Sequence, residues 1–182
     1  MKNNASEIST HAFNLADELL LDTNIWLRLY GPAAKPGDRR TVVYSKALGE
    51  MLAASCRIYI DVLILSEYIN RYARLRHNLV KTRSGISHDF KQFRKSADFN
   101  AIAFDIAGDV RQILKHCERV ESEFAALDIT ALIDEFEKGD SDFNDLVLAE
   151  LCKSRNLTLV THDGDFKDRG LKVLTANKSL LS

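Results

Sequence analysis

The stretch LLLDTNI at residues 19–25 predicts a buried strand that ends on a carboxylate followed by two small polar residues. An uninterrupted run of leucines is typical of a strand covered on both faces, as in a parallel sheet. Ligands of such sheets bind in the crevice at the carboxyl ends of the strands. The position of Asp22 therefore favours a chemical role, although capping of a following helix also explains an acid there.

A second strand of this kind is predicted at residues 157–161, where LTLVT runs into the turn HDGDF at 162–166. Two further short strands, at 57–60 and 171–174, are separated from these by segments with helical periodicity. Parallel strands need connections that cross a sheet face, so this alternation predicts helices on both sides. We expect an α/β protein, a three-layer α/β/α sandwich around a central, mostly parallel sheet of four or five strands.

Apolar spacing and breaker residues set the expected helices. They are predicted at residues 22–30, 38–54, from 61 past Tyr72, from 90 to about 114, 132–137 and 142–154. The polar stretch 78–87 is predicted to be a loop, and 123–129 fits either a short strand or a helix end.

The 182-residue chain has an ordinary globular composition, with 46% hydrophobic and 28% charged residues. We expect a single domain over residues 1–182, in which residues 1–16 are flexible and residues 78–121 form an enlarged helical segment. The first ten residues lack the basic start and apolar core of a signal peptide, and no apolar run reaches membrane-spanning length. These features favour a soluble, cytoplasmic protein without a membrane partner.

Acids from distant segments are predicted to reach one rim of the sheet: Asp22, Glu67, Asp145 and Asp163. Each follows a predicted strand or lies near the start of a predicted helix. Carboxylates do not stay ionised close together without a counter-ion, and Mg²⁺ and Mn²⁺ prefer oxygen ligands of this kind. Such a cation lowers the pKa of a ligated water and offsets charge during phosphodiester hydrolysis. The pattern therefore predicts a metal-assisted hydrolase.

Each of these acids also has a local explanation. Asp142 and the acid three residues after it lie in the first turn of a predicted helix, where capping and the helix dipole favour negative charge. Glu67 stands four residues before Arg71, the spacing of an exposed ion pair that contributes little to stability. Asp163 has the position of an Asx turn. Asp22 is explained least well by its neighbours, because no basic residue follows it directly.

The residues around these acids resemble the PIN-domain nucleases, a family whose small bacterial members include the VapC-like toxins. The resemblance rests on phrases that occur in the order typical of the family: LDTNI at 21–25, LSE at 65–67, NDLVLA at 144–149 and LVTHDGDF at 159–166. The interval of 18 residues between Asp145 and Asp163 also resembles the usual interval of the family. Together the phrases span most of the chain.

This resemblance implies a PIN-like fold and an endonuclease that cleaves single-stranded RNA with Mg²⁺ or Mn²⁺. The implied catalytic and metal-binding residues are Asp22, Glu67, Asp145 and Asp163, with Asp142 as an additional acid. The residues implied to orient the ligands or a metal-bound water are Asn24, Thr161 and Asp165. The family also implies a toxin of a toxin–antitoxin pair, with an antitoxin and a second copy of the chain as partners. This chain is longer than the compact toxins because of its central segment.

Residues 71–95 carry eight basic side chains against one acid, Asp89. Nucleic-acid affinity is dominated by the neutralisation of phosphates. Because the stretch begins just after Glu67, its basic residues are candidates for RNA binding beside the acidic pocket. These candidates are Arg71, Arg74, Arg76, Lys81 and Arg83. A solvated helix face explains the same residues equally well.

Two other functions fit parts of the pattern. A PIN-like module that binds RNA or a protein without cleavage would share the fold, but it would not need all four acids. A phosphatase with an aspartyl nucleophile would also place an acid after a strand. Phosphatases of the haloacid-dehalogenase type, however, carry a second aspartate two residues on, where this chain has Asn24.

Overall fold

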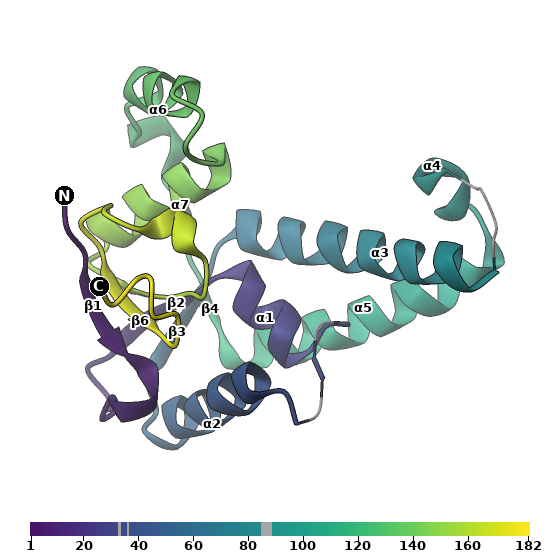
Figure 1. Ribbon diagram of the computed structural model, residues 1–182, viewed down its shortest axis with the longest axis horizontal. Coiled ribbons are helices and arrows are strands. Elements are labelled where there is room, and N and C mark those ends of the chain that lie inside the picture. Colours follow the sequence, from purple (N-terminus) through teal and green to yellow (C-terminus); the bar gives the residue numbers. More distant parts are fainter. Residues whose placement is uncertain (33, 36, 85–88) are drawn as a thin grey trace.

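The computed structural model describes the chain except for residues 33, 36 and 85–88 and the side chains of residues 83 and 84 (Figure 1). Within this part of the chain lies a six-stranded, entirely parallel sheet with the order β1-β6-β5-β2-β3-β4. The strands are β1 (Asn4–Glu7), β2 (Glu18–Leu21), β3 (Arg57–Ile60), β4 (Glu118–Arg119), β5 (Thr158–Val160) and β6 (Lys172–Thr175). The predicted fold class is confirmed, with one strand more than the upper number expected.

The leucine run at residues 19–21 lies at the centre of the sheet. β2 pairs with β5 on one side and with β3 on the other, so Leu20 lies in register with Leu159 and Tyr59. The three leucines are almost fully buried, as expected for a strand between two layers of helices. The residue that follows β2 therefore stands in the middle of the carboxyl edge of the sheet.

The two strands that the sequence does not reveal lie at the edges of the sheet. β1 is the polar segment NASE, and it pairs with β6 from Asn4 opposite Lys172 to Glu7 opposite Thr175. Part of the segment expected to be flexible is thus an edge strand, and a 3-10 helix (Ile8–Thr10) follows it. β4 has two residues and pairs with β3. Short polar strands depend on a neighbouring strand, so hydrophobic periodicity does not detect them.

The connections between strands are mainly helical. The helices are α1 (Thr23–Leu29), α2 (Arg39–Ala53), α3 (Val62–Ser84), α4 (Phe90–Phe93), α5 (Ala97–His116), α6 (Ile129–Glu137) and α7 (Phe143–Ser154). α3 is longer than expected, because it continues to Ser84 through part of the predicted loop, whose residues 85–87 lie outside the described part. The ambiguous stretch 123–129 forms a 3-10 helix (Phe124–Ala126) and the start of α6. None of the helices in the described residues is long and apolar enough to cross a membrane.

The helices form two groups around the sheet. In the view of Figure 1, α6 and α7 lie above the sheet, and α1 and α2 lie below and beside it. α3 and α5 pack against each other and project away from the sheet as an arm, with α4 at its far end. The main hydrophobic core joins the strands to the helices, whereas a smaller cluster of Leu132, Leu146 and Val147 holds α6 on α7.

Candidate functional site

Asp22 is the buried centre of a polar site at the carboxyl edge of the sheet. Its backbone N–H donates to the carbonyl of Val160 at 3.0 Å, so the ladder between β2 and β5 extends to Asp22 itself. The residue stands at the N-cap position of α1, but its side chain makes no capping hydrogen bond. The carboxylate instead accepts a hydrogen bond from Thr161 beyond β5, and the residue is 5% exposed. Local capping therefore does not explain this acid.

The segment after β5 fixes the orientation of the Asp22 carboxylate. The Thr161 hydroxyl donates to Asp22 Oδ2 at 2.7 Å and accepts from Asn24 Nδ2 and from the backbone N–H of Asp163, each at 3.0 Å. Asn24 Nδ2 also donates to Asp22 Oδ2. A hydroxyl group has one donor and two acceptor sites, so the hydrogen-bonding capacity of Thr161 is fully used. Thr161 and Asn24 thus lie in direct support of Asp22.

Glu67 reaches the site from the second turn of α3. The Thr23 hydroxyl donates to Glu67 Oε2 at 3.0 Å, and Arg71 Nη1 donates to Oε1 at 2.9 Å. The predicted ion pair with Arg71 is therefore present, and its arginine side chain is about half exposed. The bond from Thr23, which is fully buried, ties Glu67 to the first residue of α1, directly beside Asp22. Glu67 thus combines an exposed ion pair with a fixed position at the site.

The first turn of α7 brings two further acids to the site. Asp142 is the N-cap of α7 and accepts a hydrogen bond from the backbone N–H of Asn144 at 2.8 Å, so the capping alternative holds for this exposed residue. Asp145 follows within the same turn and is partly buried. Its carboxylate is repelled by the three other predicted site acids and by Asp142. Asp145 therefore faces the acidic cluster, and Asp142 lies at the rim.

The loop after β5 supplies the last acid. Asp163 Oδ1 accepts a hydrogen bond from the backbone N–H of Asp165 at 3.1 Å, which is the predicted Asx turn and begins a 3-10 helix (Gly164–Phe166). Asp163 also contributes to the electrostatic repulsion at Asp22. Asp165 supports Asp163 through its backbone N–H, and in the described part of the chain its exposed side chain forms no hydrogen bond with the cluster.

Burial and mutual repulsion disfavour the ionised forms of the two central carboxylates. Loss of hydration is the largest cause that raises the pKa of Asp22 to about 6; the hydrogen bond from Thr161 opposes it, and repulsion from Glu67 and Asp163 adds to it. Burial is also the main cause that raises the pKa of Asp145 to about 7, with repulsion from the surrounding acids. The site thus gathers negative charge, and the ion pair of Arg71 with Glu67 neutralises only part of it.

The chemistry of these side chains fits a hard divalent cation, which prefers carboxylate oxygen ligands. The acids are not drawn into a closed cage: in the part of the chain that the structure describes, no three His, Cys, Asp or Glu side chains are close enough to hold a metal ion as they stand. The carboxylates repel one another at Asp145, and Glu67 is held in an ion pair with Arg71. A divalent cation would offset the repulsion, and Asp22, Glu67, Asp145 and Asp163 are the residues that would hold it.

The basic residues of α3 are spread along the arm, and two of them have partners there. Arg74 stacks at 4.7 Å on an aromatic ring of α4, and Arg76 lies 4.0 Å from a carboxylate of α5. Lys81 is exposed and lies about 21 Å along α3 from Glu67. The Arg83 side chain lies outside the described residues. Among the side chains that are described, the ion pair of Arg71 is the direct link between this basic set and the acidic cluster.

Sequence reasoning overlooked two residues that shape the site. Thr23 directly follows Asp22 in the sequence DTN. This position next to a predicted site acid could have indicated that Thr23 contacts the site, where it donates to Glu67. Asn177 lies beyond β6, where its Nδ2 donates to the carbonyl of His162 at 2.8 Å. No local pattern marks Asn177, because the two residues are far apart in the sequence and meet only in the fold.

A parallel sheet between layers of helices, with carboxylates gathered at its carboxyl edge, defines an α/β/α protein with an acidic site. The sequence profile of the PIN domain matches residues 19–172, a range that contains every acid of the site. The chain therefore belongs to the PIN domain family. PIN domains are generally nucleases, which are hydrolases, and they typically use divalent metal ions.

Two solved structures share this fold at low sequence identity. A chain in the crystal structure of VapBC2 from Rickettsia felis, bound to a DNA fragment from their promoter, is 19% identical, with a TM-score of 0.54 over 86% of this chain and 97% of that chain. PAE2754 from Pyrobaculum aerophilum is 15% identical, with a TM-score of 0.50 over 92% of this chain and 95% of that chain. None of the curated protein sequences matches this chain.

Proposed function

We propose that this protein is an endoribonuclease that hydrolyses phosphodiester bonds in single-stranded RNA with Mg²⁺ or Mn²⁺. The observation that carries this proposal is the convergence of acids from separate segments on the buried carboxylate of Asp22. Burying an ionisable carboxylate beside other carboxylates is unfavourable for folding. Groups with strongly perturbed pKa values are concentrated at functional sites, so a chemical role accounts for this arrangement better than a structural one.

In this proposal the carboxylates hold the cation and their neighbours orient them. The ligands are Asp22, Glu67, Asp145 and Asp163. When bound, the cation lowers the pKa of a ligated water and offsets the charge that develops on the phosphate. Thr161 and Asn24 fix Asp22 Oδ2, and Thr23 fixes Glu67 Oε2, so these oxygens are oriented before a substrate arrives. The exposed carboxylate of Asp142 adds negative potential at Asp145.

The basic residues of α3 have a weaker part in this proposal. The basic residues between Arg71 and Arg83 would attract the phosphates of RNA at long range. This attraction depends on their total charge more than on direct contact. Their partners on the arm, described for Arg74 and Arg76, limit direct contact with a substrate. The acidic cluster therefore carries the chemistry, and α3 contributes to the field around it.

The direct test is cleavage of a single-stranded RNA pool by wild type and by Asp22→Asn, each with Mn²⁺, with Mg²⁺ and with EDTA. We expect cleavage by the wild type with either metal and none with EDTA or with Asp22→Asn. Asp134→Asn is a matched control, because it removes an exposed acid of α6. Equal cleavage by Asp22→Asn and wild type would contradict the proposal. RNA that is bound but left intact under every condition would favour the non-cleaving module.

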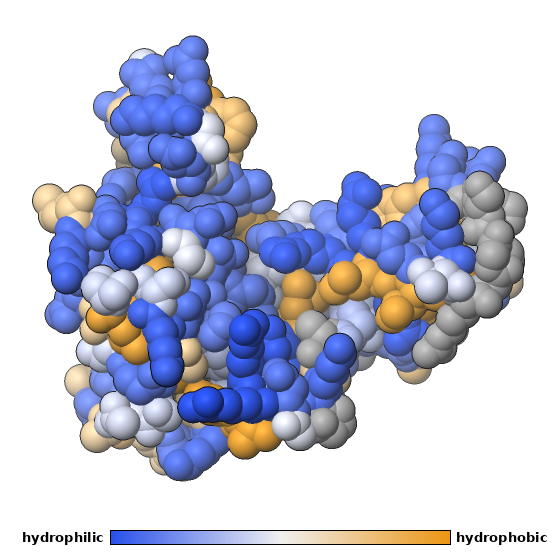
Figure 2. Space-filling view, in the orientation of Figure 1, coloured by the Kyte–Doolittle hydropathy of each residue, from blue (hydrophilic) through white to orange (hydrophobic). Residues whose placement is uncertain are grey.

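A narrower proposal is that the nuclease is the toxin of a toxin–antitoxin pair. The shared fold with a chain of VapBC2 supports it. A groove of about 250 Å³ beside the arm, lined by Pro32, Leu75 and Leu79 among others, also supports a protein partner, because Leu79 is 47% exposed there. Figure 2 shows apolar surface continuing along the arm. Exposed apolar patches of this kind mark interaction sites, here for an antitoxin or for a second copy of the chain.

Two measurements test this narrower proposal. Expression of the wild type in a bacterial host is expected to arrest growth, whereas Asp22→Asn is expected to leave growth unchanged. Normal growth with the active wild type would contradict the toxin role. Light scattering of the purified protein determines whether the chain forms a homodimer, and Leu79→Ser is expected to weaken such a dimer if the groove lies at its interface.

A further inference from the structure

A basic pocket of about 390 Å³ lies beside the acidic cluster, and the sequence-based candidates did not include it. We define it by Arg39 and Arg40 at the start of α2, His162 after β5 and Lys178 after β6, which line it together. Among the described lining residues, Glu7 is the one carboxylate. Three permanent cations against one acid give the pocket a net positive charge, the opposite of the neighbouring site.

Within the described part of the chain, the cations of the basic pocket are not held in ion pairs. Arg39, Arg40 and Lys178 are exposed, and none forms an ion pair within the described part of the chain. The nearby acids have other partners: Asp38 pairs with Arg28 at 3.0 Å and caps α2, and Glu7 accepts a hydrogen bond from Ser9 at 3.2 Å. The pocket therefore retains its positive charge toward solvent.

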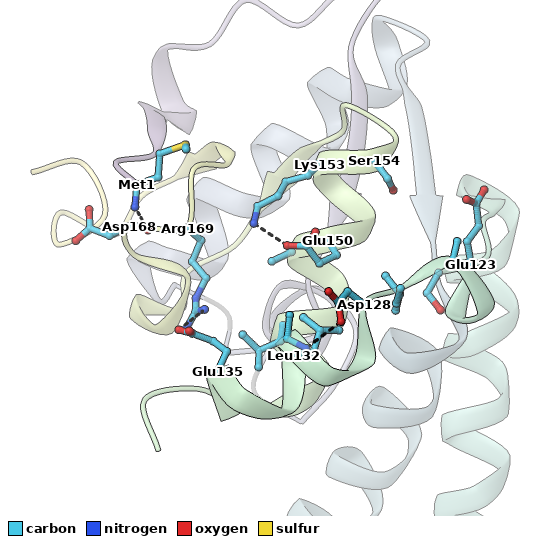
Figure 3. Close-up of a pocket in the computed structure, with 16 residues that line it drawn as sticks. Met1, Glu123, Asp128, Leu132, Glu135, Glu150, Lys153, Ser154, Asp168 and Arg169 are labelled. Carbon is cyan, nitrogen blue, oxygen red and sulfur yellow. Dashed lines mark hydrogen bonds and ion pairs between the residues drawn. The ribbon is translucent and has the colours of Figure 1, made fainter. Parts of the chain in front are cut away.

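A second cavity, of about 510 Å³ beside α6 and α7, contains cations that are paired with acids (Figure 3). Its cationic side chains are paired inside it, Lys153 with Glu150 at 2.7 Å and Arg169 with Glu135 at 3.6 Å. None of the acids of the candidate active site lines that cavity. The basic pocket differs because its cations remain available and because it adjoins the site.

One loop joins the basic pocket rigidly to the acidic cluster. The backbone N–H of His162 donates to Asn24 Oδ1 at 3.2 Å, and the His162 carbonyl accepts from Asn177 Nδ2 at 2.8 Å. A hydrogen bond of 2.9 Å links the His162 ring to the Tyr44 hydroxyl. Burial, with a smaller effect of nearby Arg40, lowers the pKa of the His162 ring. The next residue, about 3.8 Å away between Cα atoms, is Asp163.

We infer that the basic pocket binds a backbone phosphate of the RNA strand next to the phosphate that is cut. This inference rests on the proposed function, and it specifies how that site holds its substrate. The planar guanidinium group of arginine matches the geometry of a phosphate and can bind it through two hydrogen bonds. An acidic site repels a polyanion, so a cationic contact one step along the strand would hold the substrate against this repulsion.

The test compares two double variants that remove the same charge. Arg40→Gln/Lys178→Gln alters the basic pocket, and Arg57→Gln/Lys172→Gln removes one arginine and one lysine at the amino ends of β3 and β6, on the opposite edge of the sheet. The probe is a short fluorescein-labelled single-stranded RNA in EDTA, so that it stays intact, and binding is followed by fluorescence anisotropy over a range of salt concentrations. Circular dichroism checks that both variants are folded.

The pocket variant is expected to bind RNA about tenfold more weakly than wild type at about 0.1 M salt. Its plot of log affinity against log salt should flatten by about 0.7 for each lost phosphate contact. The control variant should stay close to wild type. Equal weakening of both variants, or no change in the pocket variant, would overturn the inference, because general charge or no contact would then explain the data.

Cleavage assays separate this inference from the proposed function. With Mn²⁺, the pocket variant is expected to have a higher KM and a nearly unchanged kcat. The lost contact would stabilise the bound substrate and the transition state equally. If pocket-dependent binding is observed but wild type never cleaves RNA, the nuclease proposal fails, and the basic pocket is retained only as a site that binds RNA phosphate. If wild type cleaves RNA and the pocket variant has an unchanged KM, the pocket fails and the nuclease stands.

Discussion

The acidic site and the arm of α3 and α5 differ in how far their charged side chains are buried and paired. At the site, carboxylates are buried or half-buried near one another, and burial and repulsion raise the pKa of Asp22 and Asp145. On the arm, basic residues are exposed or lie beside a partner, as Arg76 lies beside Asp105. Paired surface charges cost the folded state little stability, whereas crowded buried charges of one sign lower its stability. Unneutralised charge, more than charge density along the sequence, therefore marks the candidate site.

The largest expected effect on RNA cleavage comes from a substitution in the acidic site itself. Asp22→Asn removes the charge of the proposed central metal ligand and is expected to lower kcat/KM for RNA cleavage about a thousandfold. Asp105→Asn removes an exposed acid from the arm and is expected to change kcat/KM by less than about twofold. Rates on a labelled single-stranded RNA with Mn²⁺ provide the measurement. A similar loss in both variants would abolish the distinction between the two regions.

A smaller effect is expected from the residue that orients Asp22. Thr161→Val keeps the shape of the side chain but removes the hydroxyl that donates to Asp22 Oδ2 at 2.7 Å. Loss of such a supporting contact is expected to lower activity or Mn²⁺ affinity by about 10- to 100-fold. Thr158→Val, three residues earlier in β5, is the matched control. Titration of activity with Mn²⁺ measures both variants, and wild-type behaviour of Thr161→Val would exclude this orienting role.

The raised pKa values predict how pH affects stability without metal. A carboxyl group whose pKa is raised on folding binds more protons in the folded state, so it contributes stability below its unfolded pKa of about 3.8. That contribution is lost as pH rises through about 6 for Asp22 and about 7 for Asp145. In EDTA, Tm is therefore expected to be lower at about pH 8 than at about pH 5.

Asp22→Asn sharpens this expectation. The variant is expected to stabilise the metal-free protein at about pH 8 by about 1 to 3 kcal/mol, because it removes a buried charge, and to reduce the dependence of Tm on pH. Mn²⁺ should raise Tm of the wild type at this pH more than that of the variant, because binding to the folded state stabilises it. Identical melting profiles of the two proteins across this pH range would show that the Asp22 carboxylate is not destabilising.

The smallest expected effect lies where the two regions meet. Arg71→Gln removes the exposed ion pair with Glu67 and is expected to change the free energy of unfolding by less than about 0.5 kcal/mol. It also releases Glu67 Oε1, so the Mn²⁺ concentration for half-maximal cleavage should fall by about twofold. Urea unfolding and Mn²⁺ titrations measure the two quantities. A large loss of stability would instead assign the pair to the fold.

Local sequence patterns predicted the parts of the fold that depend on local properties. The leucine run of β2, the strand LTLVT and the helix that begins after Asp142 have apolar periodicity or capping residues of their own. β1 and β4 were missed because their order comes from pairing with β6 and β3. α3 continues to Ser84 because packing against α5 sustains a helix through a polar stretch.

The candidate site was predictable to a similar degree. Its acids follow strands or begin helices, so topology brings them to one edge. The hydrogen bonds of Thr161 and Asn24 follow from that convergence. The basic pocket was not predictable, because Arg40, His162 and Lys178 come from three separate segments and no local pattern links them. Charge along the sequence pointed instead to α3, where the structure supplies partners for several of the residues.

β1 sets a practical limit on how this protein can be engineered. It covers the hydrogen-bonding edge of β6, whose residues Val173 and Leu174 are buried. Deleting the residues before Ile8 would leave that edge open, and an open edge is a template for pairing with another chain. Shortened versions would thus be prone to strand exchange and aggregation for reasons unrelated to catalysis. Purification tags and fusion partners belong ahead of Met1 on a flexible linker, with Asn3 and β1 kept intact.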